Sequence, residues 1–133
     1  MTRINTVDPS LLIDKHLVAE YRELPRVFAL VRKAIERGES PNDKRNPNKY
    51  TLGTGHVRFF YDKLKYLANR QNSLIKEMRN RNFTVNYDNV AELVDNIPEE
   101  WYNDWTPSQE DHDINIARIT VRGGLRYKEN NNE

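Results

Sequence analysis

The strongest constraint on the fold is the spacing of apolar residues over 11–37, where they recur every three to five positions. An α-helix turns once every 3.6 residues, so this spacing gathers the apolar side chains on one helical face. These residues are Leu12, Leu17, Tyr21, Leu24, Phe28, Val31 and Ile35. Gly38 supplies a stop for this helix. Pro25 falls inside it and removes one backbone hydrogen bond, so we expect a kink near Tyr21.

Further helical segments follow along the chain. The apolar positions from His56 to about Arg81 again recur at the helical period. A short helix is expected over 89–95, with Asp88 as its cap. The third long helix opens at the capping-box pattern Thr106-Pro107-Ser108-Gln109, and Gly123 and Gly124 end it. No segment carries a convincing strand pattern.

These segments predict an all-α fold. We expect one compact domain over 1–133 with three principal helices, long polar loops such as 39–55, and an N-terminal segment packed near the first helix. Asp8 and Pro9 suit the first turn of that helix. The residues at 125–133 are expected to form a frayed tail. Three aromatic residues are expected in the core rather than as ligand platforms: Trp101, Tyr102 and Trp105.

Composition excludes several classes of site. The chain has no cysteine, which rules out disulfides, thiolate zinc sites and iron–sulfur clusters. Zero cysteine also fits an intracellular protein, in the host cytoplasm if its source is viral or bacterial. No stretch approaches the roughly 18 apolar residues of a membrane span. The three histidines, His16, His56 and His112, are far apart and show no metal-ligand spacing.

The net charge of +1 hides a strong segregation of charge along the chain. Residues 1–81 hold 17 Lys and Arg against nine Asp and Glu, whereas residues 82–113 hold nine acids and no base. Residues 114–133 return to four bases against two acids. A molecule with one basic side can steer and bind a polyanion. A dipolar surface without function explains the same pattern equally well.

Residue 2 offers unusual chemistry. Removal of Met1 would leave Thr2 with the free α-amine of the chain. Such an amine has a pKa of about 7.7–8.0, against about 10.4 for lysine, so roughly a tenth of it is neutral at pH 7. A neutral amine suits reactions that pass through a Schiff base. If Met1 is retained, the Thr2 nitrogen is a peptide amide and cannot form an imine.

Charged residues elsewhere are ambiguous when taken singly. Glu23 and Arg26 are helical neighbours, so a surface ion pair explains them without any catalytic role. A solvated or capped histidine explains His16 without any functional role. Arg118 and Arg122, at i and i+4, place two guanidinium groups on one helical face. With Arg3, Arg22, Arg26 and Lys33 they form a candidate phosphate track.

Taken together, several sequence runs indicate a protein family more specifically than any single residue does. The opening MTRIN, the run HLVAEYRELPRVF over 16–28, the triplet VRK over 31–33 and the run GHVRFFYDKL over 55–64 closely resemble the bacteriophage endonuclease V family, the pyrimidine-dimer DNA glycosylases. A weaker match continues through Ile116-Ala117-Arg118 and Arg122. The resemblance covers most of 1–122 and is strongest before residue 65.

The resemblance implies a monomeric DNA-repair enzyme that needs no metal or other cofactor. It would excise cyclobutane pyrimidine dimers from double-stranded DNA and nick the strand as an abasic-site lyase. The Thr2 amine would attack the sugar and form an imine, and Glu23 would stabilise the cation and move protons. Residues at the family's DNA-holding positions are Arg3, His16, Arg22, Arg26, Lys33, Arg118 and Arg122. Lys15 stands where the family's best-known member has a polar amide, and it is a further candidate DNA contact.

The C-terminal tail departs from the family. The best-known member ends in a run of Trp and Tyr associated with dimer recognition, whereas this chain offers only Tyr127. Aromatic faces provide stacking surfaces for exposed bases, so nicking at abasic sites should survive this loss better than dimer excision.

Alternative functions therefore stay open. One is a lyase specific for abasic sites or another modified base. A second is a non-catalytic DNA-binding or damage-sensing module. A third, an N-terminal threonine hydrolase, requires layered sheets that the sequence does not predict.

Overall fold

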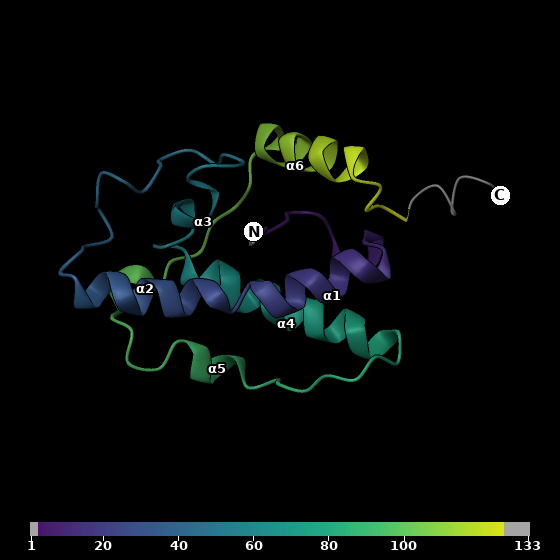
Figure 1. Cartoon of the computed structure of the whole chain (residues 1–133), viewed down its shortest axis with the longest axis horizontal. Helices are drawn as coiled ribbons and strands as arrows, with labels where there is room; N and C mark the ends of the chain where they lie inside the picture. Colours follow the sequence, from purple (N-terminus) through teal and green to yellow (C-terminus); the bar gives the residue numbers. More distant parts are fainter. Residues whose placement is uncertain (1–2, 127–133) are drawn as a thin grey trace.

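The computed structural model describes residues 3–126, and these residues fold into helices joined by loops (Figure 1). The longer helices are α1 (Asp14–Glu23), α2 (Arg26–Glu36), α4 (Leu64–Asn80) and α6 (Gln109–Val121). The short ones are α3 (His56–Phe59) and α5 (Val90–Leu93), with 3₁₀ turns η1 (Pro9–Leu11) and η2 (Glu99–Trp101). Within residues 3–126 the only β pairing is a single bridge between Leu12 and Leu125. The all-α prediction is confirmed.

The helix predicted over 11–37 is in fact two helices, α1 and α2. Pro25 has no N–H to donate to the Tyr21 carbonyl, so the helical hydrogen-bond ladder is interrupted there. The freed Tyr21 carbonyl accepts a hydrogen bond of 3.0 Å from Gln71 Nε2 on α4. The interruption expected near Tyr21 divides the predicted helix into α1 and α2, and the linking residues Leu24 and Pro25 keep right-handed helical dihedrals. Asp8 caps η1 instead of the first long helix, through a 2.9 Å bond from the Ser10 amide.

The helix predicted over 56–81 is also interrupted, between α3 and α4. Phe59, Phe60 and Tyr61 are all buried. Successive residues of a continuous helix point about 100° apart, so three in a row cannot share one buried face. A turn at 60–63 resolves this conflict and sends all three rings into the core.

Two predicted caps lie elsewhere. In α6 the cap is Ser108, which exchanges 3.1 Å hydrogen bonds with Asp111, rather than Thr106 with Gln109. Both pairs fit the capping-box spacing approximately, and the chain uses the second. Asp88 does not cap α5, because its carboxylate pairs with Arg79 at 2.7 Å. The predicted stop of α6 at the glycines is confirmed, with Gly123 at φ 68°.

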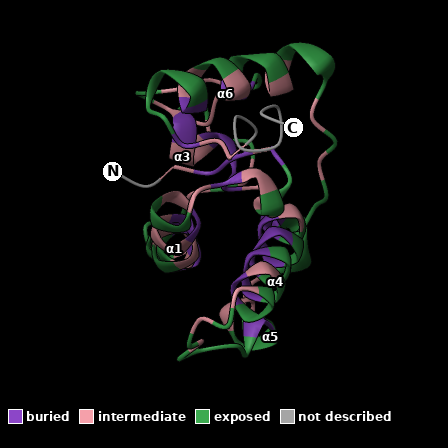
Figure 2. Ribbon diagram, turned by 90° about the vertical axis from the view of Figure 1, so that its right-hand side faces the viewer, coloured by how far each residue is buried: buried purple, intermediate pink, exposed green. Residues whose placement is uncertain are grey.

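The core lies where the inner faces of α1, α2 and α4 meet the segment around α3. Figure 2 shows buried residues on the inward sides of α1 and α4 and exposed residues along the outer face of α6. Trp101 is buried and Trp105 packs against the core, as predicted. Tyr102 is exposed, so its assignment to the core is wrong.

The N-terminal segment and the residues after α6 both reach this interior. As predicted, the N-terminal segment packs against α1, where the Asn5 amide bonds to Glu20 at 3.3 Å. Leu125 pairs with Leu12, and the Arg126 amide donates to the Leu11 carbonyl at 2.7 Å. The rest of the tail expected to fray, residues 127–133, lies outside the described residues. No helix within residues 3–126 is long and apolar enough to cross a membrane.

Candidate functional site

A cavity of about 380 Å³ opens between the N-terminal segment, α1 and the end of α6. The face of α1 that lines it follows the helical period, with His16, Ala19, Glu20 and Glu23 at steps of three and four residues. Its complete lining is Arg3, Asn5, Lys15, His16, Ala19, Glu20, Glu23 and Arg122. Five of the predicted site residues, Arg3, Lys15, His16, Glu23 and Arg122, therefore meet at one place.

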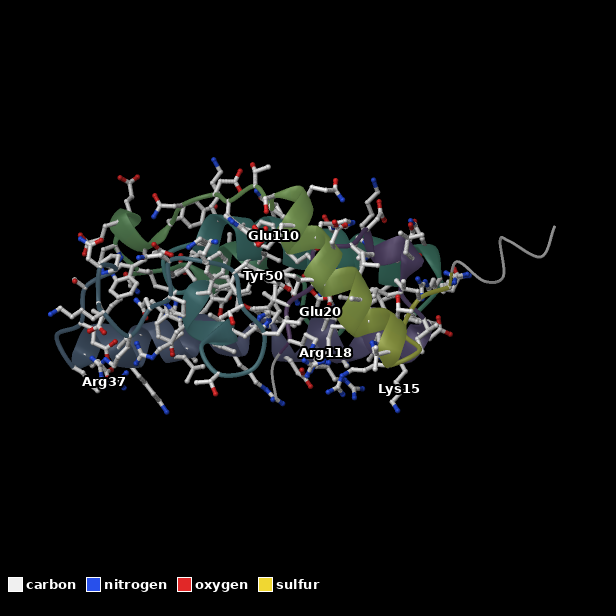
Figure 3. The ribbon with its side chains drawn as sticks, turned by 90° about the horizontal axis from the view of Figure 1, so that it is seen from above. Lys15, Glu20, Arg37, Tyr50, Glu110 and Arg118 are labelled. Carbon is white, nitrogen blue, oxygen red and sulfur yellow. The ribbon has the colours of Figure 1, made fainter. Side chains whose placement is uncertain are left out.

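The cations of this cavity repel one another. Burial lowers the pKa of Arg3, and the neighbouring charges of Arg122 and Arg118 lower it further, while Glu23 acts in the opposite direction. Burial also lowers the pKa of His16, helped by Arg3, Lys15 and Arg122. In Figure 3, Arg118 and Lys15 lie along the same edge of the molecule. Crowded cations that raise one another's energy favour an anion between them, and a phosphate diester supplies one.

Two carboxylates line the cavity, and they differ in their hydrogen-bond and ion-pair partners. Glu20 is buried and fully occupied: it accepts hydrogen bonds from Arg70 at 2.8 and 3.0 Å and from Asn5 Nδ2 at 2.7 Å. Glu23 is half-buried and makes no hydrogen bond or ion pair with another residue of 3–126. The simple surface pair between Glu23 and Arg26 is not formed. Glu23 is therefore the carboxylate with free acceptor capacity toward a substrate.

Glu20 and its partner Arg70 were not predicted as site residues. A signal for Glu20 was present, because it lies three residues after Leu17 and four before Leu24, on the buried face of α1. An acid at such a position requires a buried cation or donors. The identity of that partner, 50 residues away on α4, carries no comparable signal.

A second hollow of about 450 Å³ adjoins the cavity. Its floor is apolar, formed by Val18, Ala19 and Phe83, and charged residues at its edge include Lys15 and Arg22. Arg22 thus lies beside the cavity rather than within it. Arg26 and Lys33 are exposed on α2 and are not part of the cavity lining.

Gly124 sets how closely the end of α6 approaches α1. A Cβ atom at this position would lie 2.5 Å from His16 Nδ1 and 2.9 Å from Ile119 Cγ2. Real Cβ atoms do not approach other heavy atoms so closely. The absence of a side chain here lets the chain after α6 pass directly over His16, next to Arg122.

Some predicted features are not placed. Thr2 and Tyr127 lie outside the described residues. Within residues 3–126, no group of three or more His, Asp or Glu side chains is arranged to hold a metal ion.

The fold and cavity define a class: a small helical domain with a cation-rich site and a free carboxylate, suited to an anionic polymer. A family model described as pyrimidine dimer DNA glycosylase matches residues 1–89. The chain belongs to this family, which confirms the resemblance found in the sequence and implies a DNA-repair glycosylase that acts on DNA containing pyrimidine dimers. Arg118 and Arg122 lie beyond the matched residues, yet Arg122 lines the same cavity.

Stability should depend on the protonation of His56. Its Nε2 accepts the Ile4 amide at 2.9 Å and its Nδ1 lies 2.8 Å from the Thr51 carbonyl, an arrangement that requires the neutral ring. Burial lowers the pKa of His56 from its ordinary value of 6.5, so between the folded and unfolded values the unfolded chain binds more protons.

The free energy of unfolding is therefore expected to be constant just above pH 7 and to fall as the pH drops below about 6.5. Urea unfolding between pH 5 and 8 measures this, and His56→Gln should reduce the slope. His16 contributes in the same direction, because its pKa is also lowered. An unchanged slope in His56→Gln would contradict the assignment.

Proposed function

We propose that the protein is a bifunctional repair enzyme of the cell interior that acts as a monomer, excises pyrimidine dimers and then nicks the strand through an imine. The observation that supports this most is Glu23, a carboxylate with no hydrogen-bond or ion-pair partner among residues 3–126, in a cavity also lined by Arg3 and Asn5. Arg3, which lines this cavity with Glu23, directly follows Thr2 in the chain.

The reaction needs one nucleophile and one group that moves protons. The neutral Thr2 amine attacks C1′ of the damaged nucleotide, the C1′–N bond breaks, and the base leaves with the electron pair and takes up a proton. Opening of the sugar ring gives an imine between the amine nitrogen and C1′. A proton then leaves C2′ for Glu23, and the C3′–O bond to the phosphate breaks by β-elimination. Water hydrolyses the imine and restores the amine.

The surrounding charges match these steps. An ionised Glu23 stabilises positive charge on the sugar and the imine as it develops. Arg3, Lys15, His16 and Arg122 surround the cavity and can bind the flanking phosphates. Arg22 adjoins them over the apolar hollow.

Borohydride trapping tests the proposal. Protein whose Met1 removal is verified by mass is mixed with duplex DNA that carries either an abasic site or a thymine dimer, and borohydride reduces any imine to a stable adduct. Adducts on both DNAs, lost when the α-amine is blocked or Met1 is retained, support the glycosylase and lyase. An adduct on abasic DNA alone indicates an abasic-site lyase, the alternative favoured by the tail with only Tyr127. Salt-sensitive binding without an adduct indicates a DNA-binding module.

Phosphate binding by Arg122 should appear in the salt dependence of DNA affinity. Each phosphate contact contributes a slope of about −0.9 in log K against log salt on duplex DNA. Arg122→Ala is therefore expected to weaken binding of any duplex and to reduce the slope by about one. Fluorescence titrations at several salt concentrations measure this, with Arg79→Ala, whose side chain pairs with Asp88, as the control. Equal slopes in wild type and Arg122→Ala would exclude the contact.

A further inference from the structure

The segment 4–7 belongs to no helix or sheet, and side chains of other elements bind its backbone. The amides of Ile4, Asn5 and Thr6 donate to His56 Nε2 at 2.9 Å, Glu20 Oε2 at 3.3 Å and Asn115 Oδ1 at 2.7 Å. The Asn5 carbonyl accepts from Tyr66 Oη at 3.2 Å, and the Val7 carbonyl accepts from Arg70 Nη1. These partners come from α1, α3, α4 and α6, on both sides of the segment in Figure 1.

The Asn5 side chain joins these partners into one network. Its Nδ2 donates to Glu20 Oε1 at 2.7 Å, and its Oδ1 accepts from Asn115 Nδ2 at 3.0 Å. Asn5, Glu20, Arg70 and Asn115 are all buried, and Arg70 is ion-paired to Glu20 at 2.8 Å. Buried polar groups weaken a fold unless each is satisfied, so such a network defines one geometry sharply.

This geometry bears directly on the chain terminus. Two residues of extended chain span at most about 7 Å, so covalent geometry alone ties the Thr2 nitrogen to the fixed Ile4 amide. Next to that amide, Arg3 and Asn5 line the cavity that contains Glu23. A terminal amine has no secondary structure of its own to hold it, and rate depends steeply on its placement.

We propose that His56, Tyr66 and the Glu20–Arg70 pair are positioning residues that hold segment 4–7 so that the α-amine of Thr2 meets the sugar beside Glu23. This inference rests on the proposed imine chemistry. The network touches the backbone of the segment, whereas DNA binding rests on the cations of the cavity. Loss of a positioning bond therefore slows imine formation without weakening DNA affinity.

Two substitutions of His56 separate its two hydrogen bonds. Gln reaches the Nε2 position and can still accept the Ile4 amide, whereas Asn reaches only the Nδ1 position and keeps the Thr51 bond. In single-turnover trapping on abasic duplex DNA, His56→Asn is expected to lower the adduct rate about tenfold or more. His56→Gln should stay within about threefold of wild type, and the Kd for DNA should be unchanged in both.

A second pair of variants tests the proposal even if the His56 variants do not fold. Tyr66→Phe deletes the bond to the Asn5 carbonyl and keeps the ring that stacks on Phe60. It should slow trapping about fivefold, as expected for one hydrogen bond. The matched control is Tyr21→Phe, because that hydroxyl instead bonds the backbone of Tyr87, and its trapping rate should equal wild type.

The outcomes distinguish positioning from stability and from the chemistry itself. Slower trapping at unchanged Kd in His56→Asn and Tyr66→Phe, with recovery in His56→Gln, supports the proposal. The proposal would be overturned if both His56 variants lost the same amount of trapping rate. It would also be overturned if Tyr21→Phe slowed trapping as much as Tyr66→Phe does. Equal trapping by protein that retains Met1 would overturn the imine chemistry and the positioning proposal together.

Discussion

Glu23→Gln is expected to lower the rate of strand nicking by β-elimination by two to three orders of magnitude, within the range of about 10²–10⁴ that a positioned acid or base contributes. The amide has nearly the same shape but can neither take a proton from C2′ nor stabilise a cationic sugar by charge. DNA affinity should persist, because removal of a negative charge from a cation-rich cavity does not weaken phosphate binding.

Single-turnover nicking of abasic duplex DNA measures this effect, with Kd determined separately. Glu110→Gln is the matched control, since Glu110 is exposed on α6 and lies well away from Lys15 in Figure 3. A Glu23→Gln rate within tenfold of wild type would assign proton transfer to another group. A parallel loss in Glu110→Gln would point to a general charge effect.

Arg70→Met is expected to destabilise the fold by about 3–5 kcal/mol, because it leaves the buried Glu20 carboxylate without its cation. Both side chains are almost completely buried, at 6% and 2% exposure, so solvent cannot replace the lost charge. The substitution also removes the donor to the Val7 carbonyl. Urea unfolding at neutral pH measures the change.

The control for this variant is Arg79→Met on the same helix. Arg79 pairs with Asp88, but both side chains are more than half exposed, so the loss should stay below about 1 kcal/mol. The double variant Glu20→Gln, Arg70→Met removes both charges and should recover part of the stability. A loss for Arg70→Met no larger than that of Arg79→Met would show that the buried pair contributes little.

Local sequence signals predicted the helical class well and the helix boundaries less well. Apolar periodicity identified the long helices, but it continues through Pro25 and through the turn at 60–63 because apolar residues occur on both sides of each break. At the first break Pro25 frees the Tyr21 carbonyl, and Gln71 on α4 donates a hydrogen bond to it. Such a contact depends on which helices become neighbours, and periodicity carries no information on that.

The same distinction applies to the site. His16 and Glu23 are seven residues apart on α1, so the helical period places them on one face, and both line the cavity. The meeting of Arg122 with Arg3 joins residues more than a hundred positions apart and follows only from the packing of α6. Roles taken from the family resemblance, including that of Thr2, remain predictions for the experiments above.

The packing of α6 over the N-terminal segment also determines when the cavity can form during synthesis. During synthesis the first residues leave the ribosome long before Asn115 and Arg122, which complete the network and the cavity. A nascent chain that already exposes its terminus therefore lacks the bond from Thr6 to Asn115 and the cation at the cavity edge. The cavity beside the N-terminal segment is therefore complete only when translation has passed α6, so the site forms together with the last part of the fold.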